Sequence, residues 1–252
     1  MAKVGIIGGS GLENPEIIAE PEEVEATTRF GDPSSTLTVG KIRNVDVVIL
    51  SRHDRNHRLP PTQIPNRANL QALKDQGCTH VLATTAVGSL REEIGRGDFV
   101  ILDQFIDFTR RREVTVFDSF EDGLHHVAMP DPFDGGLRRM LFENAKAQGI
   151  SVHERGTVVT IEGPRFSTRA ESHMFRAWGA DVINMSIAPE CIIANELELP
   201  YAAVAMSTDY DCWKEDEEAV TWEAVLSIFK QNAEKMTSLL IATIPEIPRL
   251  EE

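Results

Sequence analysis

The sequence has little of what marks several common classes of protein. It holds three cysteines in 252 residues and no CxxC spacing, so we expect neither a disulfide framework nor a cysteine-rich zinc module. Basic residues number 25 against 40 acidic ones and gather in no short window, which argues against nucleic acid as a partner. There is no apolar run of membrane-spanning length and no N-terminal secretory pattern, so we expect a cytoplasmic protein that does not bind a membrane.

What the sequence does contain is a regular alternation of two kinds of segment. Apolar, β-type runs occupy residues 4–8, 45–51, 80–88, 98–107, 157–163, 181–186 and 201–208. Amphipathic stretches that predict helices occupy residues 67–77, 137–149, 169–180, 189–199 and 221–244, and each of the first three has a glycine as its last or next-to-last residue. The alternation predicts an α/β fold with a largely parallel or mixed sheet covered on both faces. In such folds ligands bind at the carboxyl ends of strands.

Several predicted strands end in small residues with hydroxyl groups. GIIGGSGL (5–12) lacks the third glycine of a dinucleotide fingerprint and the Gly-Lys-Ser/Thr of a P-loop. ATTAVGSL (83–90) and NMSIAPE (184–190) again supply hydroxyl and backbone donors. Each segment alone is equally compatible with a plain structural turn, but their recurrence predicts a site for inorganic phosphate.

The segment SRHDRNHRLPP (51–61) carries the basic residues best placed for an anion. Arg52 directly follows an apolar strand, where its guanidinium group would clamp phosphate oxygens. His53 and His57 have the spacing of a helical metal pair, but the two prolines disfavour a helix and therefore a zinc site. For the other arginines of this segment, a solvated loop is the better interpretation.

Two further segments indicate a pocket for a planar ligand. Phe166, in TIEGPRFSTRAE (160–171), would either stack on such a ligand or pack in the core. In AMSTDYDCW (205–213), Asp209 and Asp211 end a buried strand and project from the same face. Burial and mutual repulsion would raise the pKa of one carboxyl toward neutrality, as an acid catalyst needs. An acidic strand end capped by the next helix is the alternative, and Cys212 is either a reactive thiol or a small filler.

Seven motifs occur together in the order of one family. They are GIIGGSGL, SRHDRNH, TTAVGSLREEI, DQFIDFT, TIEGPRFSTRAE, ADVINMSIAPE and STDYDCWKEDEEAV, and the match runs from about residue 3 to the C-terminal helix. On these motifs the chain resembles the trimeric purine nucleoside phosphorylases, most closely their methylthioadenosine phosphorylase branch. The resemblance implies one α/β domain over residues 1–252, with a central mixed sheet, a small distorted barrel and flanking helices.

The same resemblance implies an activity and an assembly. The reaction would be reversible phosphorolysis of S-methyl-5′-thioadenosine to adenine and 5-methylthioribose 1-phosphate, a pentosyltransferase step of purine and methionine salvage. The enzyme would be a homotrimer or a dimer of trimers with active sites near the subunit interfaces. It would need no metal or organic cofactor, because inorganic phosphate is a co-substrate.

The resemblance also implies a role for each site residue. The residues expected to hold phosphate are Ser10, Arg52, His53, Thr85, Ala86 and Ser186. Those expected to contact the nucleoside are Met185 beneath the ribose, Phe166 and Ser167 along the base, Asp209 at N7 as the catalytic acid, Asp211 near the 6-amino group, Val220 and Trp222 around the 5′ substituent, and His126 reaching that pocket from a neighbouring subunit.

Departures from the family pattern leave the substrate partly open. In the family that the chain resembles, members that prefer 6-oxopurines look to carry Asn at the position of Asp209. The carboxylate here therefore favours a 6-aminopurine. Trp222 is bulkier than expected near the 5′ group, and Ser10 and Ser186 replace threonines common in the branch while keeping the hydroxyl. Purine nucleosides, 5′-methylthioinosine and 5′-deoxyadenosine therefore remain alternatives. A non-catalytic nucleoside-binding protein is the alternative from another class, and it would have no need of Arg52 and His53.

Overall fold

The computed structural model describes residues 2–8, 18–121, 123–216 and 221–250. Its strands are β1 (Lys3–Gly8), β2 (Ala19–Val24), β3 (Leu37–Ile42), β4 (Val45–Ser51), β5 (His80–Ser89), β6 (Phe99–Ile101), β7 (Gln104–Phe108), β8 (Val152–His153), β9 (Thr157–Ile161), β10 (Val182–Asn184) and β11 (Tyr201–Tyr210). Its helices are α1 (Asn66–Asp75), α2 (Gly135–Ala147), α3 (Arg169–Ala177), α4 (Ile187–Glu196) and α5 (Trp222–Thr243), with short 3-10 turns η2 (Pro61–Gln63) and η3 (Ile244–Leu250).

The strands form one mixed sheet that branches at β5. Along one edge, β5 pairs in parallel with β11 over nearly its whole length. Its other edge is divided, because the first half pairs with β1 and the end pairs with the antiparallel β10. One branch continues from β1 through β4 and β3 to β2, and the other runs from β10 through β9 to β7. The α/β fold with a mixed sheet is therefore confirmed, but the described strands do not close into the small barrel that the resemblance implied.

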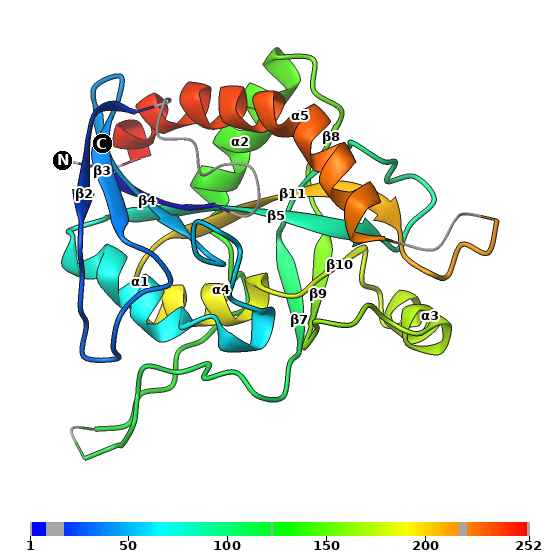
Figure 1. The fold of residues 1–252 in the computed structure, drawn as a ribbon, viewed down its shortest axis with the longest axis horizontal. Coiled ribbons are helices and arrows are strands. Elements are labelled where there is room, and N and C mark those ends of the chain that lie inside the picture. Colours follow the sequence, from blue (N-terminus) through cyan, green and yellow to red (C-terminus); the bar gives the residue numbers. More distant parts are fainter. Residues whose placement is uncertain (1, 9–17, 122, 217–220, 251–252) are drawn as a thin grey trace.

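Helices cover both faces of the sheet, as the alternation of segments predicted. Figure 1 shows α2 and α5 on one side and α1 and α4 on the other, with α3 beside the shorter branch. Side chains alternate between the two cores along each strand, since Val47 and Ile49 join the core under α2 and α5 while Val48 and Leu50 face the opposite core. Within the described ranges, no helix has both the length and the apolar character needed to cross a membrane.

The sequence predicted the helix ends well and the strands less completely. After α1, α2 and α3 the chain turns at Gly77, Gly149 and Gly179, each with a positive φ that glycine adopts without a steric penalty. The predicted strand at residues 98–107 is wrong as a single element, because it divides into β6, which pairs with β11 and β8, and β7, which pairs with β9.

Candidate active site

A cavity of about 470 Å³ lies where the two branches of the sheet diverge. Its walls come from the loop after β4, the second half of β5, the ends of β10 and β11, the loop after β9 and the first turns of α5. Ten of the predicted site residues line it, namely Arg52, His53, Thr85, Ala86, Phe166, Ser167, Met185, Ser186, Asp209 and Asp211. The structure thus brings together residues from motifs far apart in the chain, and their individual roles stay predictions.

One end of the cavity, here called the arginine end, comprises Arg52, His53, Thr85, Ala86 and Ser186. The Arg52 side chain is only 1% exposed, and its Nε and Nη2 atoms donate to the two carboxylate oxygens of Glu190, which is completely buried. Its Nη1 atom donates to the carbonyl oxygen of Thr84 at 2.8 Å, so three of its five N–H groups are engaged. This bidentate pairing fixes the plane of the guanidinium group beside the cavity and leaves one N–H on each terminal nitrogen for a ligand.

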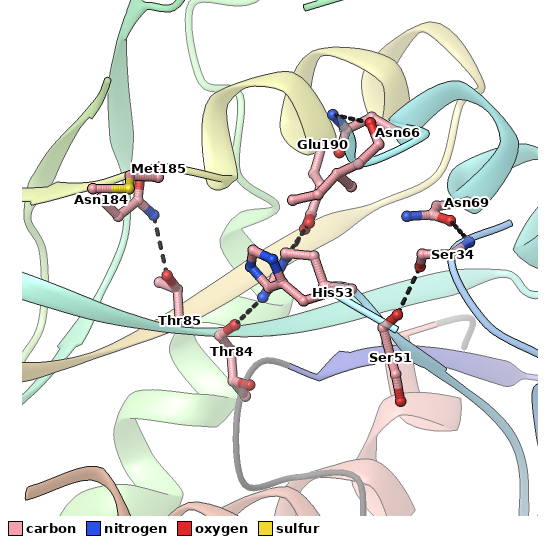
Figure 2. A network of polar contacts seen from close by, with 12 residues as sticks. Ser34, Ser51, His53, Asn66, Asn69, Thr84, Thr85, Asn184, Met185 and Glu190 are labelled. Carbon is pink, nitrogen blue, oxygen red and sulfur yellow. Dashed lines mark hydrogen bonds and ion pairs between the residues drawn. The ribbon is translucent and has the colours of Figure 1, made fainter. Parts of the chain in front are cut away.

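Glu190 has a second partner that completes the buried pair. The Tyr201 hydroxyl donates to Glu190 Oε2 at 2.9 Å, and this side chain is also buried. Burial and the Glu190 charge both raise the pKa of the Tyr201 phenol well above its ordinary value, so the phenol keeps its proton and remains a donor. The hydrogen bonds that Arg52 makes with Thr84 and Glu190 lie beside His53 (Figure 2).

The His53 ring is held by its own loop. Its Nδ1 atom lies 2.8 Å from the carbonyl oxygen of Leu59, and the ring stacks on His57 with centroids 4.5 Å apart. Burial, followed by the nearby charge of Arg52, lowers the pKa of His53 to about 4. The imidazole is therefore neutral at physiological pH.

A chain of hydrogen bonds from α4 positions Thr85. The backbone N–H of Ala188 donates to Thr160 Oγ1 at 3.0 Å, and the Thr160 hydroxyl in turn donates to the side-chain oxygen Oδ1 of Asn184 at 2.8 Å. Asn184 Nδ2 then donates to Thr85 Oγ1 at 3.2 Å, beside Met185 (Figure 2). Three elements of the fold therefore set the direction of one hydroxyl group.

Ser186 occupies the N-cap of α4 without using its side chain as a cap. Its hydroxyl group is therefore not committed to the helix, and the residue lines the cavity. The positive end of the α4 dipole begins at the same place, which favours an anion there. Beneath the strand end that carries Arg52, the Ser34 hydroxyl donates to Ser51 O at 2.6 Å, and the Ser34 N–H donates to Asn69 (Figure 2).

The other end of the cavity, the carboxylate end, comprises Asp209, Asp211 and Ser167. Both aspartates approach Gly88 of β5, where an added Cβ would lie 3.0 Å from Asp209 Oδ1 and 3.5 Å from Asp211 Cβ. The two residues therefore reach the same point of β5, as their spacing predicted, through the carboxylate of Asp209 and the Cβ of Asp211. Gly88 follows Thr84 by four residues on β5, which separates the two ends of the cavity by about 13 Å along an extended strand.

The two aspartates differ in their hydrogen bonds. Asp211 accepts from the Ser167 hydroxyl at 2.7 Å and 2.5 Å through its two oxygens, whereas Asp209 accepts from Thr208 Oγ1 at 2.7 Å. Burial, aided by the charge of Asp211, raises the pKa of Asp209 to about 6. A carboxyl group with such a pKa can hold a proton near neutrality and release it to a base.

Phe166 and Cys212 complete the predictions made for this end. Phe166 lines the cavity and is 43% exposed, so its ring lies at the mouth of the pocket and not in the core. Cys212 is absent from the lining described, and its thiol donates to the Ser167 carbonyl oxygen at 3.3 Å. Burial raises the pKa of this thiol, which opposes a role as a nucleophile.

Four predicted residues are not among the described residues that line the cavity. Ser10 and Val220 lie outside the described residues. Trp222 is the first residue of α5, and its side chain is likewise outside the description. His126 is exposed on the segment 109–131, where it contacts Phe120, away from the cavity of its own chain.

Sequence reasoning missed several residues that form the site. Glu190 is the most important, because it lies 138 positions from Arg52 and only the fold joins them. Arg112, with a side chain 1% exposed, binds the Glu162 carboxylate at 2.9 Å and donates to the Met185 carbonyl oxygen at 3.2 Å. It is one of three consecutive arginines, and nothing in the sequence distinguishes this buried one from the two before it. On the apolar wall, Val225, Leu226 and Phe229 of α5 carried only an ordinary helical pattern.

The histidine pair does not form a metal site with its neighbours. His53 and His57 both line the cavity, but their rings stack. Across the described part of the chain, no group of three or more His, Cys, Asp or Glu side chains is arranged to bind a metal ion. The donors of the arginine end suit an oxyanion better, since they are N–H and hydroxyl groups.

Known proteins that resemble this chain do so over nearly its whole length. The family model of the phosphorylase superfamily matches residues 3–245. S-methyl-5′-thioadenosine phosphorylase from Xenopus tropicalis is 54% identical, covering 99% of this chain and 90% of its own length, and that from Saccharolobus solfataricus is 48% identical over 100% and 92%.

A solved structure of methylthioadenosine phosphorylase from Schistosoma mansoni with adenine has a TM-score of 0.94 at 41% identity, covering 99% of this chain and 93% of its own. A mutant of the adenosine/methylthioadenosine phosphorylase from the same organism, with methylthioadenosine bound, gives 0.92 at 40% identity and covers 99% and 92%. This chain belongs to the phosphorylase superfamily.

Proposed function

We propose that this protein is a pentosyltransferase that catalyses the reversible phosphorolysis of S-methyl-5′-thioadenosine to adenine and 5-methylthioribose 1-phosphate. It would act in purine and methionine salvage through one catalytic domain spanning residues 1–252. The observation that carries the proposal is a single cavity with Arg52 at one end and, at the other, Asp209, whose pKa is raised to about 6. Relatives of 48% to 54% identity bear the name of this activity.

The two ends of the cavity divide the reaction between them. Phosphate at the arginine end would be held by Arg52 and by the hydroxyl groups of Thr85 and Ser186. One of its unprotonated oxygens attacks C1′, while the bond from C1′ to N9 breaks and leaves both electrons on the purine. The ribosyl ring becomes cationic in the transition state, and the bound phosphate dianion stabilises it.

Asp209 would neutralise the charge that develops on the leaving base. Its proton passes to N7 as the C1′–N9 bond breaks, and the carboxylate then regains a proton from solvent. Over the whole reaction, hydrogen phosphate loses one proton and the departing adenine gains one. The raised pKa of Asp209 suits this role, since the group must hold a proton before the bond breaks and release it during cleavage.

The carboxylate end also favours a 6-aminopurine. Asp211 accepts two contacts from the Ser167 hydroxyl and would accept the exocyclic amino group of adenine. A 6-oxo group in that place has no hydrogen to donate to the carboxylate. Two acceptors would then face each other, and both buried polar groups would stay unpaired. Phe166 would cover the base from the mouth of the pocket.

The apolar wall supplied by α5 supports the methylthio group as the 5′ substituent. Val225 and Phe229 are buried, and both line the cavity together with Leu226. A methylthio group gains from contact with such a surface, whereas a 5′ hydroxyl would lose a hydrogen bond to water there. Trp222 and Val220 would complete this pocket.

We also propose a homotrimer, or a dimer of trimers, in the reducing cytoplasm. The segment 109–131 extends away from the body of the molecule (Figure 1) and exposes Phe120, Leu124 and Val127. Contact with a neighbouring subunit would cover these side chains and carry His126 toward that subunit's 5′ pocket. Three free cysteines, two of them buried, agree with a reducing compartment. Light scattering after size exclusion would test the assembly, and a monomeric mass would contradict it.

The test of the activity is phosphate-dependent release of free base, compared as kcat/KM for methylthioadenosine, adenosine, 5′-deoxyadenosine, inosine and 5′-methylthioinosine. Methylthioadenosine should lead by at least about tenfold, which is roughly 1.4 kcal/mol of transition-state binding. If the inosines lead, the phosphate site stands and the proposed recognition of the base is wrong. If no substrate releases base when phosphate is added, the catalytic proposal fails and a nucleoside-binding protein becomes the better interpretation.

A further inference from the structure

The proton on the His53 ring has a defined position. Its Nδ1 atom lies 2.8 Å from the carbonyl oxygen of Leu59. A carbonyl oxygen can only accept a hydrogen bond, so Nδ1 must carry the proton and donate it. In a neutral imidazole the other nitrogen, Nε2, then has a lone pair and acts as an acceptor.

The surroundings of His53 oppose a second proton on Nε2. Burial is the largest cause, and the charges of Arg52 and Arg112 and the adjacent His57 all act in the same direction. Stacking against the His57 ring, at 4.5 Å between centroids, also holds His53 in place. With a pKa of about 4, His53 stays neutral over the range in which the enzyme would work.

The arginine end therefore combines several hydrogen-bond donors with one fixed acceptor. Arg52 can only donate, and the hydroxyl group of Ser186, which does not cap α4, adds a further donor. A fully deprotonated oxyanion, which has acceptors only, would set one of its oxygens against the Nε2 lone pair. The hydrogen phosphate dianion has three unprotonated oxygens for the donors and one P–OH group for the acceptor.

We propose that His53 is a specificity residue that accepts a hydrogen bond from the P–OH group of hydrogen phosphate. The site would then select hydrogen phosphate over dianions of the same shape and charge that carry no proton, such as sulfate and fluorophosphate. This inference rests on the proposed function, because it assigns the protonation form of that reaction's co-substrate. It also keeps the proton on the oxygen that faces His53, which leaves an unprotonated and more nucleophilic oxygen to attack.

The first test needs only the wild-type protein and its anions. Calorimetric titration with phosphate, sulfate and fluorophosphate at about pH 8.5, where most inorganic phosphate is the hydrogen phosphate dianion, should give at least tenfold tighter binding of phosphate, about 1.4 kcal/mol. Repeating the phosphate titration in two buffers of different ionisation enthalpy should show no proton taken up by the protein. Equal affinities for the three anions, or uptake of about one proton, would overturn the proposal.

The second test assigns the preference to His53. In His53→Ala the affinity for phosphate should fall about tenfold or more, while the affinities for sulfate and fluorophosphate stay level or rise. His173→Ala is the matched control, because His173 is an exposed histidine of α3 outside the cavity lining, and it should keep the wild-type order of affinities. If His53→Ala weakens all three anions equally, the residue is merely structural and the inference is wrong.

These binding tests can fail or succeed independently of the proposed phosphorolysis. Anion binding is measured without nucleoside and without turnover, so the preference for hydrogen phosphate can be present in a protein that fails to cleave methylthioadenosine. Conversely, phosphorolysis with equal affinity for the three anions would uphold the function and reject the role of His53. If His53→Ala does not fold, as shown by its circular dichroism, the wild-type comparison still tests the preference for hydrogen phosphate, and equal affinities for the three anions would still overturn the proposal.

Discussion

At the arginine end of the cavity two opposite charges are buried together, whereas at the carboxylate end two like charges share one wall. Arg52 and Glu190 are almost inaccessible and bind one another through both carboxylate oxygens. Asp209 and Asp211 approach the same glycine, and the pKa of Asp209 rises to about 6. A paired charge stays ionised and fixes a geometry, while an unpaired one is poised to exchange a proton. The same pocket therefore needs both arrangements.

The largest expected effect comes from breaking the pair at the arginine end. Glu190→Gln keeps the shape of the side chain but leaves the buried Arg52 charge without compensation, which should lower the free energy of unfolding by about 3–5 kcal/mol. Urea denaturation would measure the loss. Glu113→Gln is the control, since Glu113 is an exposed partner of Arg67 and its loss should cost less than about 1 kcal/mol. Similar losses in both variants would mean that burial of the pair is unimportant.

Removing the acid at the carboxylate end should lower the rate of the reaction without weakening the fold. Asp209→Asn cannot deliver a proton to the leaving base, so kcat/KM for methylthioadenosine should fall by about a hundredfold to a thousandfold. Phosphate affinity, measured by calorimetry, should stay near that of the wild type because the arginine end is intact. A variant that retains more than about a tenth of the activity would show that Asp209 does not transfer the proton.

The same substitution should stabilise the protein in a pH-dependent way. The folded protein holds the Asp209 proton up to about pH 6, whereas the unfolded chain releases it near the ordinary value of about 4. The contribution of this group to stability is therefore lost as the pH rises from about 4 to 6. Asp209→Asn should match the wild type at low pH and exceed it by about 2–3 kcal/mol above pH 6. A difference that does not vary with pH would contradict the raised pKa.

A smaller effect should distinguish the two causes of that pKa. Burial is the larger cause and the charge of Asp211 a lesser one, so Asp211→Asn should lower the pKa of Asp209 only in part. Because the reaction needs the protonated acid, the alkaline limb of the kcat profile should move to lower pH by less than about one unit. Ser167→Ala keeps both carboxylates and should leave the limb in place. An unchanged limb in Asp211→Asn would mean that the two carboxylates do not interact.

Local signals in the sequence were sufficient for most of the fold. Glycine after an amphipathic stretch marked the ends of α1, α2 and α3, and apolar β-type runs marked β1, β4, β5 and β11. The edge strand β2 (AEPEEV) was missed because it is exposed and charged and contains a proline, which a strand tolerates at an edge. The separation of β6 from β7 depends on pairing with distant strands, which no local pattern reveals.

For the candidate site, sequence identified residue types but not their partners. Asp209 and Asp211 followed from strand geometry, since residues two apart on a strand share a face. Glu190 and Arg112 act through contacts with residues far away in the chain, and His53 acquires its fixed tautomer from the Leu59 carbonyl. Such contacts come from tertiary structure, so they could be learned only from the folded molecule.

The pairing of β5 with β11 has a consequence for how the molecule is made. Val81 pairs with Tyr201, so the two strands at the heart of the site lie 120 positions apart. A ribosome adds about 5–20 residues each second, and β11 emerges after most of the chain. Until then one long edge of β5 has no partner and could pair with another chain. The strand β11, which carries Asp209, therefore also covers the edge of β5 and so protects the new chain from aggregation.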